Sequence, residues 1–300
     1  MINGLFILAC SVSLLTGAVA VGADNLRQQT PYEKVKIFIK QIADSNPQTT
    51  KLIRVGDSDS GDTIWGLQIG NGPAHHLVVA THHGNEYGST EVAAAFANDI
   101  AKNPIEGATV FVIPTLNIVG FNHNNRNEPA SNGTSLDPNR DYPGPCTTSG
   151  PFFLKSTASL AKFIEDQNII VAATLHTFTP AVAYPWGMDT PDTGTPYDDI
   201  FTKLAKAATV ESGYEVGNST QLIYGADGTF EDYAFWKLGI WTLLFELGDT
   251  HSPNQSQVQN MIATNVPGLR RMVTVAPESR APNHSFSGRC SKTHFDMHKE

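Results

Sequence analysis

Hydrophobic and polar residues follow two repeating patterns between residues 31 and 275. Apolar residues recur at helical spacing in four stretches, residues 31–47, 89–103, 152–167 and 196–213. Short runs of apolar, β-forming residues lie between them, at 76–81, 108–117, 168–178 and 240–247, and residues 51–72 alternate like two strands around a Gly/Asp/Ser turn. Because continuously apolar strands alternate with helices, we expect an α/β fold: a single domain with a mixed, mostly parallel twisted sheet and helices on both faces.

The two ends of the chain differ from this pattern. Residues 1–23 carry no charged side chain and end in small residues, which predicts a secretory signal peptide that is cleaved before Val21 or Asp24. An uncleaved membrane anchor is the alternative, because the apolar run is long enough to span a bilayer. We expect one folded domain over residues 24–276. Residues 277–300 are rich in Pro and Ser with irregularly spaced histidines, which predicts a mobile C-terminal tail.

Composition and charge narrow the possible partners. The formal net charge is -9 and the 20 Lys and Arg residues are scattered, which excludes a nucleic-acid-binding surface. Outside the predicted signal the chain has two cysteines, Cys146 and Cys290. In an exported protein these two can form a disulfide, although two unpaired thiols also fit the sequence. We expect a monomer that is secreted or periplasmic, with no stable membrane association once the signal is removed.

Polar residues capable of binding a metal follow three of the predicted strands. His83 and Glu86 lie just past the first of them in the stretch "VVATHHGNEYGSTE", His176 ends the strand at 168–178, and Glu246 ends the strand at 240–247. Parallel strands deliver such residues to the same edge of a sheet. Catalytic zinc takes three protein ligands from His and carboxylate side chains, so these residues predict a metal site.

Other histidines near this stretch are poorer candidates. His82 is followed three positions later by Asn85, which is a poor zinc ligand, and a single His-x-x-Glu match is in any case a weak signal. His75 and His76 have no acidic residue at that spacing, and we expect them at the protein surface.

A second polar motif is "SLDPNRDYPG", residues 135–144. It places Asp137, Asn139 and Arg140 in one turn-forming stretch. The planar guanidinium of Arg is suited to binding a carboxylate, and Asn adds a hydrogen-bond donor. A salt bridge within a loop would use the same residue types, so this motif alone leaves both interpretations open.

Taken together, these residues resemble the zinc carboxypeptidase family across residues 31–275. His83 and Glu86 match its His-x-x-Glu ligand pair, and His176 in "LHTFTPAVAYPWG" matches its second histidine. The "DPNR" segment matches the family's Asp-x-Asn-Arg. Tyr224 and Glu246 are 22 residues apart, which is the family's spacing between its substrate-contacting tyrosine and its catalytic glutamate.

The resemblance implies one zinc ion per chain and a role for each matched residue. Asn139, Arg140 and Tyr224 would hold the free carboxylate at the end of a peptide, and Asp137 would orient a zinc-bound histidine. Glu246 would transfer the proton of the attacking water. Arg126, in "NHNNRNEP", would stabilise the developing oxyanion. No inhibitory prosegment is expected, because the fold-like sequence starts soon after the predicted signal.

The same resemblance places Glu231 at the base of the pocket for the substrate side chain. An acid there predicts a preference for C-terminal Lys or Arg, although Asp227 or Asp232 could supply the charge instead. The motif "HGNE" is equally at home in murein-peptide amidases, which act on diaminopimelate-containing cell-wall peptides, and in related acylamino-acid deacylases. Both enzyme types are kept as alternatives to a carboxypeptidase that acts on peptides. A degenerate binding module of the same fold is a further alternative.

Overall fold

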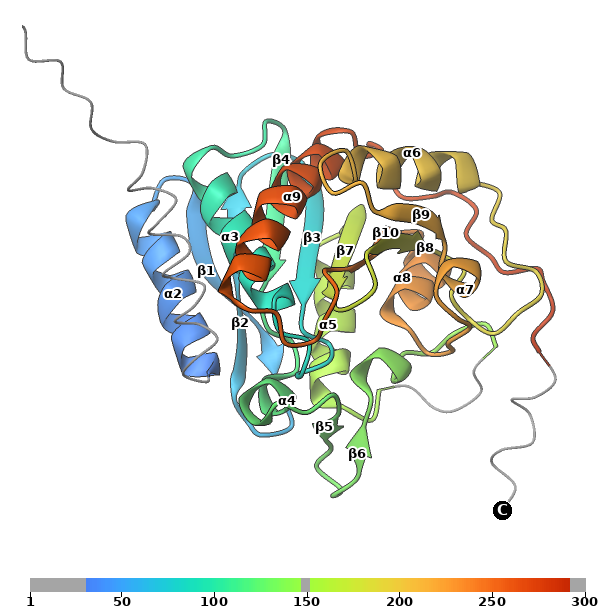
Figure 1. The fold of residues 1–300 in the computed structure, drawn as a ribbon, viewed down its shortest axis with the longest axis horizontal. Coiled ribbons are helices and arrows are strands. Elements are labelled where there is room, and N and C mark those ends of the chain that lie inside the picture. Colours follow the sequence, from blue (N-terminus) through green and yellow to red (C-terminus); the bar gives the residue numbers. More distant parts are fainter. Residues whose placement is uncertain (1–30, 147–151, 292–300) are drawn as a thin grey trace, which may run out of the picture.

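A mixed sheet of eight strands runs through the computed structural model, which describes residues 31–146 and 152–291 (Figure 1). The predicted signal peptide lies outside the described residues. Across the sheet the strands are β1 (Thr50–Asp57), β2 (Thr63–Gly70), β4 (Ala108–Ile113), β3 (Ala74–Ala80), β7 (Val171–His176), β10 (Trp241–Glu246), β8 (Ala181–Tyr184) and β9 (Glu215–Asn218). The pairs β4/β3, β3/β7, β7/β10 and β8/β9 are parallel, and the other three are antiparallel. The predicted α/β class with a mostly parallel mixed sheet is confirmed.

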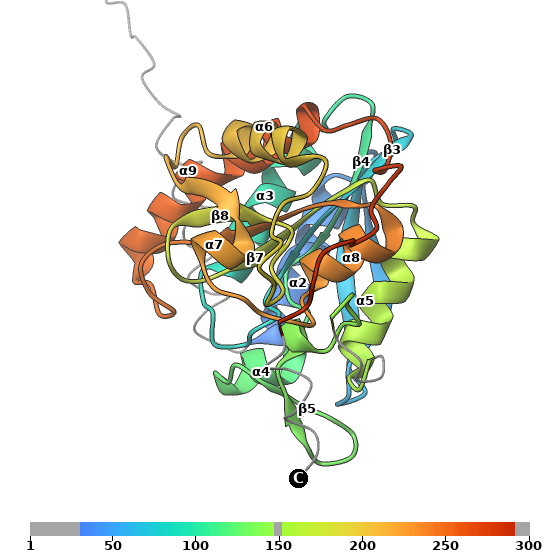
Figure 2. The same ribbon diagram turned by 90° about the vertical axis from the view of Figure 1, so that its right-hand side faces the viewer.

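Helices cover both faces of this sheet, as expected (Figure 2). One face packs against α2 (Tyr32–Ser45), α3 (Ser89–Lys102), α6 (Asp198–Ala208) and α9 (Gln255–Thr274). The other face packs against α5 (Lys155–Asp166) and α8 (Phe230–Leu238). The shorter elements are α4 (Ile118–His123), α7 (Ser219–Leu222), a two-stranded ribbon of β5 (Glu128–Pro129) and β6 (Ser135–Leu136), and a 3-10 turn at Pro138–Arg140. No helix in the described part of the chain is both long enough and apolar enough to cross a membrane.

The central strands are apolar throughout because each contributes to two cores. In β3, Leu77 and Val79 face the core under α5, whereas Val78 and Ala80 face the core under α3 and α9. Successive side chains of a strand point to opposite faces, so a strand with a helix layer on each side needs apolar residues at every position. This explains the unbroken apolar runs of the sequence, and it fixes the carboxyl ends of β3, β7 and β10 at one edge.

The expectation that His75 and His76 lie at the surface is wrong for His76, and His75 is half-buried. Both belong to β3, and His76 is only 2% exposed. The Nδ1 atom of His75 lies 2.6 Å from the carbonyl oxygen of Gln167. Burial, with a smaller contribution from the neighbouring His75, lowers the pKa of His76 to about 4, so this histidine is neutral at physiological pH.

The C-terminal segment also departs from the prediction of a mobile tail. Its described part packs against the domain: the carbonyl of Ser279 accepts a hydrogen bond of 2.8 Å from the Trp241 indole, and the Arg280 guanidinium donates to the carbonyl of Ile169 at 2.7 Å. Cys290 forms a disulfide with Cys146, whose Cα atom lies 5.4 Å away. The sequence could not indicate this packing, because the residues involved carry no periodic pattern.

Candidate active site

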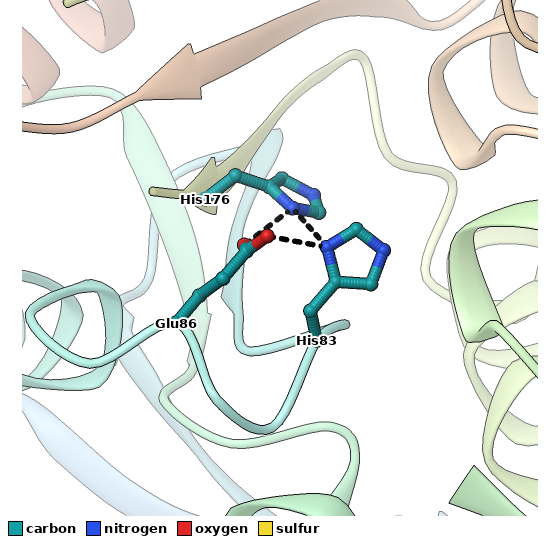
Figure 3. Close-up of side chains that lie close together, drawn as sticks. All are labelled: His83, Glu86 and His176. Carbon is teal, nitrogen blue, oxygen red and sulfur yellow. Dashed lines mark hydrogen bonds and ion pairs between the residues drawn. The ribbon is translucent and has the colours of Figure 1, made fainter. Parts of the chain in front are cut away.

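His83, Glu86 and His176 converge at the carboxyl edge of the sheet (Figure 3). The first two lie in the turn after β3, and His176 is the last residue of the adjacent parallel strand β7. The Nδ1 atom of His83 lies 2.6 Å from Oε1 of Glu86, and the Nδ1 atom of His176 lies 2.9 Å from Oε2 of Glu86. One ligand atom from each residue lies within 4.8 Å of the others, and all three side chains are buried.

The turn that carries this pair depends on a glycine. A Cβ atom on Gly84 would lie 2.0 Å from the backbone of Gly120 in α4, so no other residue fits there without displacing backbone. The Glu86 amide donates to the carbonyl of His83 at 3.3 Å, which closes the turn, and the amide of Thr177 donates to Oε2 of Glu86 at 3.1 Å. The turn therefore holds Glu86 against the end of β7.

The charges of His83 and Glu86 depend on each other. Burial disfavours the charged forms of His83 and Glu86, but their mutual attraction outweighs it, so the pKa of His83 is raised and the pKa of Glu86 is lowered. The Nδ1 atoms of His83 and His176 face each other at 3.2 Å. Two imidazole nitrogens and a carboxylate that converge in this way match the donor set of a zinc site, and their ligand atoms fit around one cation.

Asp137 connects this cluster to its surroundings. Its Oδ1 atom lies 2.9 Å from Nε2 of His83 and also accepts the backbone amide of Asn139 at 2.8 Å. Its Oδ2 atom accepts a hydrogen bond of 2.9 Å from Nε of Arg126. Nη1 of that arginine lies 3.5 Å from Oε1 of Glu86. In the neutral imidazole, Nε2 of His83 donates to Asp137 and the Nδ1 atom keeps its lone pair for a metal ion.

Glu246 ends β10 and pairs with His176 across the parallel ladder. Its Oε2 atom is buried and has no hydrogen-bond partner in the part of the chain that the structure describes. Burial, together with repulsion from Glu86 and Glu231, raises the pKa of Glu246 well above its usual range, and Arg126 only partly opposes this. A cation held by the three neighbouring ligands would lower the pKa of Glu246 again.

Arg140 and Tyr224 lie on the solvent side of the same pocket. Nη2 of Arg140 donates to the Tyr224 hydroxyl at 3.1 Å, and 55% of Tyr224 is exposed. Gly228 lies four positions after Tyr224 in the same loop and has φ of 77°. A Cβ atom on Gly228 would lie 2.4 Å from the carbonyl oxygen of Arg140. The loop that carries Tyr224 therefore packs closely on the "DPNR" segment, which brings two distant parts of the chain to one side of the pocket.

The sequence of the chain is matched by proteins of known type. A family model described as zinc carboxypeptidase matches residues 35–268. The chain belongs to the zinc carboxypeptidase family. It is a metallocarboxypeptidase, a zinc-dependent peptide hydrolase.

Individual relatives agree with this assignment. Carboxypeptidase B of Astacus astacus is 26% identical over 262 residues, which cover 73% of this chain and 86% of the relative. Zinc carboxypeptidase A 1 of Drosophila melanogaster is 25% identical over 259 residues, which cover 72% of this chain and 60% of the relative. Bovine thrombin-activatable fibrinolysis inhibitor, solved with a tick carboxypeptidase inhibitor, shares the fold with a TM-score of 0.75 at 15% identity, covering 83% of this chain and 98% of that chain.

Glu231 of this carboxypeptidase lies in the pocket together with the metal cluster and Arg140. It is 2% exposed, and both of its carboxylate oxygens have a neutral donor. Oε1 accepts a hydrogen bond from the Thr174 hydroxyl, and Oε2 lies 3.5 Å from the side-chain nitrogen Nδ2 of Asn139. Neutral donors leave the negative charge of a buried carboxylate available to a cationic ligand.

The two neighbouring acids, Asp227 and Asp232, bond to backbone amides of residues 187–189. The Asp232 carboxylate accepts hydrogen bonds from the backbone amides of Gly187, at 2.8 Å, and Met188, at 2.7 Å. Asp227 accepts the backbone amide of Asp189 at 3.1 Å. Both acids hold a loop in place, and of the three only Glu231 lines the pocket that contains the metal cluster.

The structure also places beside the site two residues that the motifs did not indicate, His82 and Thr174. His82 is fully buried, its Nε2 atom lies 3.1 Å from the Tyr142 hydroxyl, and its ring stacks on that of His176 with 5.5 Å between centroids. Thr174 lies two positions before His176 in β7, so both side chains point to the same face of the sheet. Strand periodicity was therefore the one signal that could have singled out Thr174.

Proposed function

We propose that this carboxypeptidase removes the C-terminal residue of peptides and favours Lys and Arg at that position. The observation that carries the proposal is the pocket itself, which is lined by the two histidines of the metal-competent cluster, by Arg140 beside Tyr224, and by the buried carboxylate of Glu231. A peptide end presents three matching groups in the same order: a scissile carbonyl, a terminal carboxylate and a side chain.

The terminal carboxylate would bind at Arg140. The guanidinium can donate two parallel hydrogen bonds to a carboxylate, and the Tyr224 hydroxyl, which it now contacts, can add a third. The Nδ2 amide of Asn139 lies on the inner side of the same segment. Binding of a free chain end at these residues makes the reaction that of an exopeptidase, because an internal peptide has no carboxylate to offer.

The hydrolytic step would use Glu246 and Arg126. When bound by His83, Glu86 and His176, zinc supplies Lewis-acid polarisation of the carbonyl and activation of water. The Glu246 carboxylate would accept the proton of the attacking water and pass it to the leaving amine. The Arg126 guanidinium, which Asp137 holds at the edge of the cluster, would donate to the oxygen on which negative charge develops.

Specificity would follow from the charge of Glu231. A Lys or Arg side chain that enters the pocket gains a partner for its cation, whereas a neutral side chain leaves the carboxylate with neutral donors only. Diaminopimelate carries an extra carboxylate beside its amine, and that group would approach Glu231 with the same sign of charge. This argument favours C-terminal Lys and Arg over cell-wall peptides.

The test is a comparison of substrates with the zinc-loaded protein. We expect acylated dipeptides that end in Arg or Lys to be cleaved with a higher kcat/KM than those that end in Phe or diaminopimelate, and amidation of the C terminus to abolish cleavage. Faster hydrolysis of simple N-acyl amino acids would identify a deacylase instead. Release of diaminopimelate from muropeptides at the highest kcat/KM would identify a murein-peptide amidase.

We also propose that the protein is exported. The support is the uncharged apolar sequence of residues 1–23. N-terminal sequencing of protein recovered outside the producing cell should begin at Val21 or Asp24. Protein that retains residue 1 and sediments with membranes would show that the segment is an anchor.

A further inference from the structure

One wall of the substrate pocket is a loop, residues 186–192, which we call the pocket wall. Gly187 of this loop lines the pocket. On the inner side, the carbonyl of Gly187 accepts the Ala226 amide at 2.6 Å, and Asp232 in α8 accepts the amides of Gly187 and Met188. The inner side of the wall is therefore tied to α8 and to the loop that carries Tyr224.

The outer side of the pocket wall is held by the C-terminal segment, residues 279–291, which we call the strap. The amide of Ser291 donates to the carbonyl of Asp189 at 3.1 Å, and the Thr190 hydroxyl donates to the carbonyl of Arg289 at 2.7 Å. The ring of Phe286 packs edge-on against Trp186, with 5.2 Å between centroids. After α9 the chain passes α6 and runs down the right-hand side of the domain in Figure 1.

The disulfide connects the strap to the other side of the pocket. Cys290 lies between the two strap residues that bond to the wall, and its partner Cys146 lies six positions after Arg140. Between those two positions, the amide of Tyr142 donates to the carbonyl of Gly228 at 3.1 Å, and Tyr142 is buried. A single covalent bond thus links the segment that carries Asn139 and Arg140 to the outer side of the pocket wall.

We propose that the strap is a positioning element of the substrate pocket. The disulfide and the contact of Phe286 with Trp186 hold the pocket wall at a set distance from Arg140, and this distance determines how well the terminal residue of the substrate fits. The proposal rests on the proposed function, because it assigns the effect to binding of a C-terminal residue. His176 and Glu246 end strands of the sheet, and His83 and Glu86 lie in the turn after β3. In the described part of the chain, no hydrogen bond, ion pair or ring contact joins these four residues to the strap, so the strap acts on substrate binding rather than on the hydrolytic step.

The experiment compares three variants with the wild type in the zinc-loaded, full-length protein. The double variant Cys146→Ser/Cys290→Ser removes the covalent link, and Phe286→Ala removes the aromatic contact while it retains the disulfide. Phe111→Ala is the matched control: its ring makes an edge-on contact with Phe163, also with 5.2 Å between centroids, and no hydrogen bond or ring contact in the described part of the chain joins Phe111 to the strap. Each protein is assayed well below its unfolding midpoint.

We expect both strap variants to raise KM for a dipeptide that ends in Arg by about three- to tenfold, with kcat within about twofold of the wild type. The control should lose stability with no change in KM. Unchanged KM in both strap variants, an equal loss of kcat, or the same rise in KM in the control would overturn the proposal.

Hydrogen exchange separates this proposal from the proposed function. Faster amide exchange in residues 186–192 of the strap variants, with wild-type exchange in the control, supports the positioning role whether or not the substrate is cleaved. Wild-type exchange in all three variants overturns it. Absence of carboxypeptidase turnover in the zinc-loaded wild type counts against the proposed function alone.

Discussion

Replacement of Glu231 by Gln tests the basis of side-chain specificity. Gln has nearly the same shape and retains an acceptor for the Thr174 hydroxyl, so the change removes the charge while it leaves the packing almost intact. We expect kcat/KM for a substrate that ends in Arg to fall, and kcat/KM for a substrate that ends in Phe to stay the same or to rise slightly. The quantity of interest is the ratio of these two values.

The size of the effect follows from the burial of the carboxylate. Glu231 is 2% exposed, so solvent screens its charge only weakly. A hydrogen bond to a charged group contributes about 1.5–3 kcal/mol, roughly twice the value for neutral partners. This range corresponds to a loss of about 10- to 150-fold in kcat/KM for the cationic substrate, since about 1.4 kcal/mol equals a factor of ten.

Two neighbouring acids provide the controls for this prediction. Asp227→Asn and Asp232→Asn also replace an acid near the pocket, but both carboxyl groups bond to backbone amides of the pocket wall, and burial raises the pKa of Asp232 to about 7. Their variants should lose stability and keep the Arg-to-Phe ratio. A ratio that changes by less than about threefold in Glu231→Gln would refute the reasoning, and a larger change in either control would assign the specificity to that acid.

Three further predictions concern chemistry, metal and pH. Glu246→Gln should reduce kcat by at least about a thousandfold and leave the zinc content, measured by atomic absorption, at one per chain; substantial residual turnover would assign the proton transfer to another group. Removal of zinc with a chelator should abolish hydrolysis and lower the unfolding midpoint, because a ligand at 1,000 times its Kd stabilises the folded state by about 4 kcal/mol; unchanged turnover would contradict the metal site. Glu128 is buried, accepts a hydrogen bond of 2.5 Å from Ser156, and burial raises its pKa to about 7. The folded state therefore holds this proton more tightly than the unfolded chain, so the stability that Glu128 contributes at about pH 5, up to about 3 kcal/mol, should be lost as pH rises above 7. In urea denaturation across this range, the wild type should lose that amount of stability relative to Glu128→Gln, and a difference between the two proteins that stays constant with pH would contradict the prediction.

The elements that the sequence predicted well are those whose pattern follows from burial. The strands β3, β4 and β7 have a core on each side and are therefore largely apolar on both faces, so they stand out against their surroundings. The helix α9 was missed although Val258, Met261, Leu269 and Met272 recur at helical spacing, because Pro267 and many polar residues interrupt the pattern. The short strands β8 and β9 were missed as well, since four residues carry too little pattern to be distinguished from a loop.

For the site as well, some features could be predicted from the sequence, whereas others depend on the tertiary structure. The residue types and spacings of His83, Glu86 and His176 were sufficient to indicate a metal site, because few donor sets suit zinc and strand ends share an edge. Which other side chains complete the pocket depended on distances between segments far apart in sequence. The partner of Glu231 in β7, the carboxylate that joins Arg126 to the metal cluster, and the bonding of Cys290 to Cys146 all arise from packing between such segments. Local sequence determines a side chain's chemistry and its face of a strand, whereas only the tertiary structure decides which group lies opposite it.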